Sequence, residues 1–172
     1  MPSLIETNVF LFIFVSYCVL IVGTFIPVLQ AIRQKVQLHD GGKGFESSTH
    51  FSKKEIDVLK QHYSRMQGTL GYWKNMSEKY RRFHYYCMLW TIPSAVLVPI
   101  LTQFVDTQNP YARWTATAMS AFTAILISFH KALNTEDNFK AFRHGESEFY
   151  DLYRRFLDRP WEFGSNFQQQ SG

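Results

Sequence analysis

The chain has 172 residues, with 18 Lys and Arg against 14 Asp and Glu, 46% hydrophobic residues and a mean hydropathy of −0.18. These averages exclude collagen-like, disulfide-rich and disordered proteins. The charges are unevenly distributed, however, because three stretches contain no Asp, Glu, Lys or Arg: Val9–Leu29, Tyr85–Val105 and Trp114–His130. A transmembrane helix needs about 20 nearly uncharged residues, so the sequence predicts an all-α integral membrane protein with three transmembrane helices.

The first uncharged stretch is predicted to be a retained anchor within residues 1–37. A cleaved signal peptide has a basic leader and an apolar core of about 7 to 15 residues. Here the leader has no Lys or Arg and contains Glu6, the core has 21 residues, and Arg33 and Lys35 follow it. This pattern favours an anchor whose N-terminus lies outside.

A flexible linker is expected over residues 38–51, which include a glycine-rich turn at residues 39–44. The turn lacks the Gly-Lys-Ser/Thr sequence and the preceding strand of a phosphate-binding loop. We therefore interpret it as a linker only.

A cytoplasmic helix is predicted to begin at Ser52, because Ser52 and Glu55 have the spacing of a capping box. Beyond it, one face of the helix repeats at alternating steps of four and three and continues into the second uncharged stretch. Its residues are Ile56, Leu59, Tyr63, Met66, Leu70, Trp73, Ser77, Tyr80, His84 and Cys87. Gly68 and Gly71 each weaken the helix by about 1 kcal/mol relative to Ala, which leaves a bend there as an alternative.

The second and third uncharged stretches are predicted to form a transmembrane hairpin with a short outer loop. The third stretch carries small residues at intervals of four, which allow helix backbones to approach closely. They are Ala116, Ser120, Ala124 and Ser128. This small-residue stripe is expected to pack against the second stretch or a neighbouring subunit, and lining a pore is the alternative.

A second cytoplasmic helix is predicted to begin at Asn134 or Thr135, which can cap it, and to end at Pro160. Its aromatic residues follow the same spacing: Phe139, Phe142, Phe149, Tyr153 and Phe156. Both cytoplasmic helices meet the same membrane face, so we expect them to pair antiparallel as a stalk. Residues 52–160 would thus combine stalk and hairpin, followed by a polar tail over residues 161–172.

The basic residues predict the orientation. Eleven Lys and Arg lie between the first and second stretches and six follow the third, but the hairpin has only Arg113 and the leader has none. Because Lys and Arg favour the cytoplasmic side, the N-terminus is predicted outside and the C-terminus inside. The segment 31–84 has a net charge of +6, and Lys79, Arg81 and Arg82 are expected to face anionic lipid. Lipid explains these charges more economically than nucleic acid, which is not an expected partner.

No motif predicts catalysis, and neither a metal nor a cofactor is expected. His84 and Cys87 share a helix face, but no third group orients them, so we interpret them as packing residues. His130 and Lys131 are expected to reach toward the membrane interface. The uncharged stretches also lack the ionisable groups of proton-coupled transporters.

The order of helix, transmembrane hairpin and charged amphipathic helix over about residues 52–160 resembles the SLATT membrane domains. The resemblance rests on Ile92-Pro93, on residues 130–133 and 138–144, and on residues 148–152. It implies a pore-forming effector that accompanies a nucleotide-sensing or nucleotide-synthesising partner. The additional first span and the lack of an attached sensor domain depart from that pattern, so a separate sensor or soluble partner protein is expected.

The sequence thus predicts a non-enzymatic, oligomeric membrane protein, with homo-oligomerisation expected from its unpaired helix faces. A SLATT-like pore-forming or membrane-perturbing effector is the leading interpretation. A structural or scaffolding membrane protein, whose cytoplasmic helices recruit a partner, is the alternative, and a membrane enzyme is third.

Overall fold

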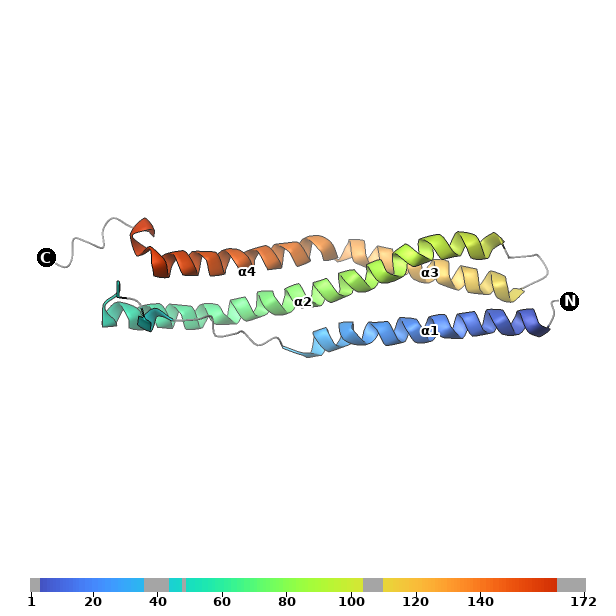
Figure 1. Ribbon diagram of the computed structural model, residues 1–172, viewed down its shortest axis with the longest axis horizontal. Helices are drawn as coiled ribbons and strands as arrows, with labels where there is room; N and C mark the ends of the chain where they lie inside the picture. The colour runs from blue at the N-terminus through green and yellow to red at the C-terminus, as the bar shows by residue number, and fades with distance from the viewer. Residues whose placement is uncertain (1–3, 36–43, 48, 104–109, 164–172) are drawn as a thin grey trace. The chain divides into compact units, whose positions relative to one another are not determined.

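The structure is a computed structural model that describes residues 4–35, 44–47, 49–103 and 110–163. Regular structure in these residues is helical, without a strand, which confirms the predicted all-α class for them (Figure 1). The elements in chain order are α1 (Leu4–Arg33), η1 (Phe45–Ser47), α2 (Lys53–Gln103), α3 (Pro110–Ala132), α4 (Thr135–Asp158) and η2 (Pro160–Phe163). The predicted linker, outer loop and polar tail lie partly outside the described residues.

These helices form two compact units, which are described separately. The three-helix unit lies within Met1–Gln34 and Glu78–Phe139, and the two-helix unit lies within Lys35–Ser77 and Lys140–Gly172. Helix α2 contributes residues 53–77 to the two-helix unit and residues 78–103 to the three-helix unit.

Three helical stretches of the described chain are long and apolar enough to cross a membrane. They lie within Val9–Arg33, Lys53–Gln103 and Tyr111–Asp158. Large apolar side chains remain exposed on the three-helix unit, as at Phe12, which is 72% exposed, and Val22, which is 66% exposed. Exposure of this extent is unusual for a soluble protein and is consistent with a membrane location.

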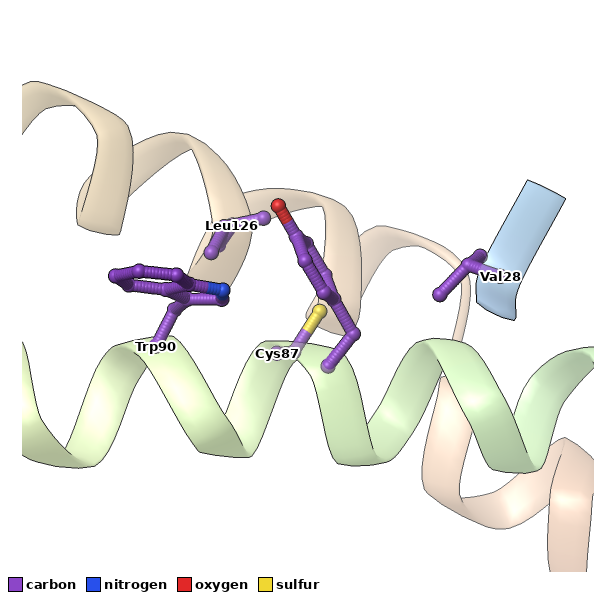
Figure 2. Packing of buried hydrophobic residues seen from close by; sticks show 5 residues of the cluster. Val28, Cys87, Trp90 and Leu126 are labelled. Carbon is purple, nitrogen blue, oxygen red and sulfur yellow. The ribbon is translucent and has the colours of Figure 1, made fainter. Parts of the chain in front are cut away.

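The core of the three-helix unit joins all three of its helices. Figure 2 shows Val28 from α1, Cys87 and Trp90 from α2, and Leu126 from α3 packed together. The Trp90 ring contacts both Tyr17 of α1 and Phe122 of α3, with ring centroids 5.1 Å and 6.3 Å away. Cys87 is therefore a packing residue, as predicted.

Contacts along these helices show their directions. On α2, Arg82 contacts Pro27 of α1 and the later Trp90 contacts the earlier Thr24. Likewise His84 contacts His130 of α3, whereas Trp90 contacts Phe122. Helix α2 therefore runs antiparallel to both α1 and α3 in this unit.

The start of α2 has the predicted capping box. The Ser52 backbone N–H donates to Glu55 Oε2 at 2.7 Å, and the Glu55 N–H donates to Ser52 Oγ at 3.4 Å. Hydrogen bonds from the Ser52 side chain and backbone to the Glu55 carboxylate lower the pKa of that carboxyl below its ordinary value. The helix then continues through Gly68 and Gly71 without interruption.

The junction of α3 and α4 confirms the predicted start of the second cytoplasmic helix, because α4 begins at Thr135 with Asn134 directly before it. Thr135 is fully buried, and its Oγ1 has no hydrogen-bond partner among the described residues, so its side chain does not cap α4. Asn134 instead adopts a left-handed conformation with φ 42°, which Asn tolerates better than most residues, and its carbonyl accepts from the Asn138 N–H at 2.9 Å. Helix α4 ends at Asp158, before Pro160, as predicted.

Aromatic pairs join α4 to α2 and to Phe51, which lies two residues before the start of α2, in the two-helix unit. The pairs are Phe51 with Phe156, Tyr63 with Tyr153, and Tyr72 with Phe142, with ring centroids 5.3, 5.0 and 6.0 Å apart. Across these three pairs, the residue numbers rise from Phe51 to Tyr72 on one segment while they fall from Phe156 to Phe142 on α4. The contacts therefore follow opposite chain directions.

Candidate functional site

A charged cluster marks the beginning of the α2 segment in the three-helix unit. Glu78 Oε2 lies 2.6 Å from Arg81 Nη2, and Glu78 Oε1 accepts from Arg82 Nε at 2.6 Å. Burial raises the pKa of Glu78, but the hydrogen bonds from Arg82 and Arg81 outweigh it, so the pKa lies below its ordinary value. The cluster therefore holds one carboxylate between two guanidinium groups.

Arg82 also connects this cluster to α1. Its Nη1 donates to the Pro27 carbonyl oxygen at 3.3 Å. Two of the three basic residues that the sequence assigned to the lipid surface, Arg81 and Arg82, thus surround Glu78, whereas Lys79 forms no ion pair with Glu78.

An open groove of about 820 Å³ lies between α1 and α2 beside this cluster. Arg81 and Arg82 line it together with Pro27 and Val28 of α1 and apolar residues farther along α2. A volume of this size is within the range of small-molecule sites. The groove therefore has a basic part and an apolar part.

Two histidines contact each other between α2 and α3. His84 Nδ1 and His130 Nε2 are 2.8 Å apart, which requires one ring nitrogen to donate and the other to accept. His130, which the sequence predicts to reach toward the membrane interface, therefore also has a partner within the three-helix unit that this prediction did not include. Sequence spacing gave no signal for this contact, since the residues are 46 positions apart.

Two polar groups in the same core find hydrogen-bond partners across helices. Trp90 Nε1 donates to Thr24 Oγ1 at 2.9 Å, and Tyr86 Oη donates to the Ile21 carbonyl at 3.4 Å. Neither contact could be predicted from the spacing of the residues along the chain. The only signal for them is the presence of Thr24 and Trp90 within otherwise apolar stretches, which indicates that each polar group needs a partner.

The small-residue stripe of α3 is split between buried and exposed positions. Ala116 is buried, whereas Ser120, Ala124 and Ser128 are exposed. The Ser120 and Ser128 hydroxyls donate to the carbonyls four residues earlier, each at 2.8 Å. Three of its four positions thus lie on the outside of the three-helix unit, with their hydroxyls bonded to their own helix.

Most residues of the predicted stalk seam that fall in the two-helix unit are buried or half-buried. Leu70 and Ser77 are buried, whereas Met66 is 44% exposed. The half-buried members are Ile56, Leu59, Tyr63, Trp73, Phe142, Phe149, Tyr153 and Phe156. The Tyr63 ring stacks on those of Phe149 and Tyr153. The remaining seam residues, Tyr80, His84, Cys87 and Phe139, belong to the three-helix unit.

Within the part of the chain that the structure describes, no three His, Cys, Asp or Glu side chains gather in a way that could hold a metal ion. The contacts observed in the candidate site are hydrogen bonds, ion pairs and apolar contacts. These interactions suit binding and assembly.

Comparison with known proteins identifies a family. No curated protein and no solved structure matches the chain. Residues 70–164 match a family described as proteins of unknown function, DUF4231, and nothing in this match connects the chain to the SLATT domains. The matched residues are more than half of the chain and extend from α2 through α3 and α4 into η2. The chain therefore belongs to the DUF4231 family.

Proposed function

We propose that this protein is a non-enzymatic, oligomeric membrane protein that acts as a SLATT-like pore-forming or membrane-perturbing effector. Three helices long and apolar enough to cross a membrane support its insertion. The trigger would come from a separate sensor or soluble partner protein, as the SLATT resemblance implies.

The observation that carries the proposal is the outward position of the small-residue stripe on α3. Ser120, Ala124 and Ser128 are exposed on the three-helix unit, and both hydroxyls are already hydrogen-bonded. Small residues four apart promote close helix association in membranes, where apolar burial alone gives no driving force between helices. The stripe is therefore proposed as the contact between copies of the chain around a pore.

The proposed orientation places the N-terminus outside and the C-terminus in the cytoplasm. The excess of Lys and Arg in residues 31–84 and after the third uncharged stretch supports this orientation. The antiparallel directions of α2 relative to α1 and α3 fit successive spans that cross a membrane in alternating directions. The sequon at Asn75 tests it, because Asn75 would face the cytoplasm. In a eukaryotic membrane, Asn75 should stay unglycosylated while a sequon in an added N-terminal extension is glycosylated, and glycan on Asn75 would reverse the assignment.

The two-helix unit is proposed to form the cytoplasmic antiparallel stalk. The opposed order of its aromatic pairs supports this arrangement. Replacing Leu59 or Trp73 by Glu would bury a charge in this seam and should abolish assembly.

Ion or dye flux from liposomes tests pore formation. Reconstituted protein should release the contents, whereas Ala124→Leu should reduce release because it adds bulk to the stripe. Ile125→Phe is the matched control, since it adds bulk at an exposed position about 100° around the same helix. An oligomer that never releases ions or dye would contradict the pore, and equal effects of both substitutions would contradict the stripe.

The second candidate is a scaffold whose cytoplasmic helices recruit a soluble partner. An apolar pocket of about 300 Å³ in the two-helix unit favours it, with a lining that includes Val58, Leu59 and Phe156. A protein that assembles and recruits a partner without conducting would fit this function. Liposome flux therefore separates the two candidates.

A further inference from the structure

The groove between α1 and α2 has a basic part and an apolar part, which together suit an amphiphilic ligand. Arg81 and Arg82 line one part of it, and Met88, Leu89 and Ile92 line another. At 1.5 Å per residue, Ile92 lies about 16 Å farther along α2 than Arg81. An anionic group and an apolar chain at that separation would match the two parts of the groove.

The basic part of the groove retains the capacity to bind an anion. Two guanidinium groups face a single carboxylate, Glu78, which leaves the cluster with a net positive charge. Each guanidinium has five N–H donors, and the bonds to Glu78 and to the Pro27 carbonyl use only some of them. These bonds also hold the Arg82 side chain in place, which lowers the entropic cost of binding a phosphate.

The apolar part lies within the uncharged stretch Tyr85–Val105. Leu89 is 54% exposed and Ile92 is 57% exposed on the three-helix unit. Tyr85 lies between the two parts and lines the groove, and tyrosine favours the headgroup layer of a membrane. Basic pockets between transmembrane helices on the cytoplasmic side suit anionic lipid headgroups.

We propose that this groove is a binding site for one anionic phospholipid of the cytoplasmic leaflet. Its phosphate binds Arg81 and Arg82, and an acyl chain lies along Met88, Leu89 and Ile92. The lipid then contacts α1 and α2 at once and strengthens their contact beside Pro27. This inference rests on the membrane insertion and orientation proposed above, but it does not require pore formation.

Retention of lipid by the full-length protein tests the site. The chain is reconstituted in phosphatidylcholine nanodiscs that contain a minority of phosphatidylglycerol, then released into zwitterionic detergent, and retained lipid is counted by native mass spectrometry. Wild type should retain one phosphatidylglycerol per chain in preference to phosphatidylcholine. Equal retention of the two lipids would overturn the proposal.

Arg81→Gln and Lys79→Gln separate a site from general surface attraction. Arg81 is chosen because Arg82 also bonds to α1, and Lys79 is the matched control because it has the same charge two residues away and does not line the groove. Loss of one basic residue at an anionic surface costs about fivefold in affinity. Arg81→Gln should lower retention well beyond the effect of Lys79→Gln, and equal losses would contradict a specific site.

A second pair of variants tests the apolar part. Leu89→Trp fills the groove, whereas Val96→Trp adds the same side chain two turns farther on, at a position that does not line it. Leu89→Trp should abolish retention and Val96→Trp should preserve it. Retention of phosphatidylglycerol by Leu89→Trp would overturn the proposal. Disulfide crosslinking of two Leu89→Cys chains would also overturn it, because the crosslink would place a second copy of the chain in the groove.

Alkaline extraction of membranes distinguishes a failure of the lipid site from a failure of the proposed membrane insertion. A chain that alkali extracts is not integral, and that result overturns membrane insertion and the lipid site with it. A chain that resists extraction but retains no phosphatidylglycerol overturns the lipid site alone.

Discussion

At the scale of single residues, Trp90 is the side chain that joins the helices of the three-helix unit. Its indole N–H donates to Thr24 of α1, and its ring meets Tyr17 and Phe122 edge-on. Edge-on aromatic pairs and a satisfied indole N–H are both favourable in an apolar interior. Trp90 thereby contributes to the register of α2 against both neighbouring helices.

Thr24→Val should reduce the stability of the three-helix unit. Valine has nearly the shape of threonine but leaves the Trp90 N–H without an acceptor, at a cost of about 1 kcal/mol. Thr117→Val is the control, because Thr117 is exposed and its hydroxyl donates to the Arg113 carbonyl of its own helix. Denaturation in detergent micelles, followed by tryptophan fluorescence, should show a lower midpoint for Thr24→Val only.

Glu78 should make stability depend on pH in the acidic range. Its pKa is lowered in the folded protein from an ordinary value of 4.5, so the folded state favours the carboxylate. The stabilisation is therefore fully present above that value and is lost as pH falls through the lower folded pKa. Glu78→Gln should lower the unfolding midpoint at neutral pH, and its difference from wild type should vanish in acid.

Asp57→Asn is the matched control for Glu78, since Asp57 is an exposed acid on the same helix. It should leave the midpoint nearly unchanged at both pH values. A Glu78→Gln midpoint that differs from wild type by the same amount in acid and at neutral pH would contradict the ion pairs with Arg81 and Arg82.

At the scale of elements, Trp73 of α2 lies against Gly145 of α4 in the two-helix unit. A Cβ built on Gly145 would lie 3.5 Å from the Trp73 ring, which is ordinary van der Waals contact. Glycine here thus leaves room for a methyl group but not for a long side chain. The tryptophan ring covers the α4 backbone at this point.

Substitutions at Gly145 should therefore depend on size. Gly145→Ala should stabilise the two-helix unit by about 0.5 to 1 kcal/mol through helix propensity. Gly145→Leu should destabilise it, since overpacking costs about 1 to 3 kcal/mol. At Gly68, where nothing lies within 4 Å, both substitutions should be tolerated. Thermal unfolding followed by circular dichroism measures all four, and equal effects of Leu at both sites would refute the contact.

Local features of these elements could be predicted from the sequence, whereas contacts between them could not. The capping box of Ser52 and Glu55 depends on residues three positions apart, so its spacing alone reveals it. The contact of His84 with His130 depends on the register of α2 against α3. That register results from the packing of many side chains, including Trp90 against Phe122, and no single spacing encodes it.

The candidate site was predictable to a similar degree. Arg81 and Arg82 stood out as basic residues beside an apolar stretch, and Glu78, three and four residues earlier on the same helix, is a partner that this spacing alone predicts. The Pro27 carbonyl, in contrast, becomes a partner of Arg82 only when α1 packs against α2. The exposure of Ser120 and Ala124 could not be predicted from the sequence either, because a small residue suits both a buried and an exposed helix face.

At the scale of the whole molecule, the charge distribution and the exposed apolar surface support the same account. The net charge of +4 combines a +6 segment, residues 31–84, with other segments that are neutral or slightly acidic. The uncharged stretches instead expose large apolar side chains such as Phe12 and Ile92. Lipid can cover this surface, and other copies of the chain can cover the stripe on α3.

The number of chains per particle tests this account most directly. Full-length protein should be reconstituted in lipid nanodiscs large enough for several copies, at a low ratio of protein to discs, and weighed by single-particle mass measurement. Our account predicts particles with one defined number of chains greater than one, because a pore built from nearly uncharged spans needs several subunits. Particles that contain a single chain throughout would contradict it.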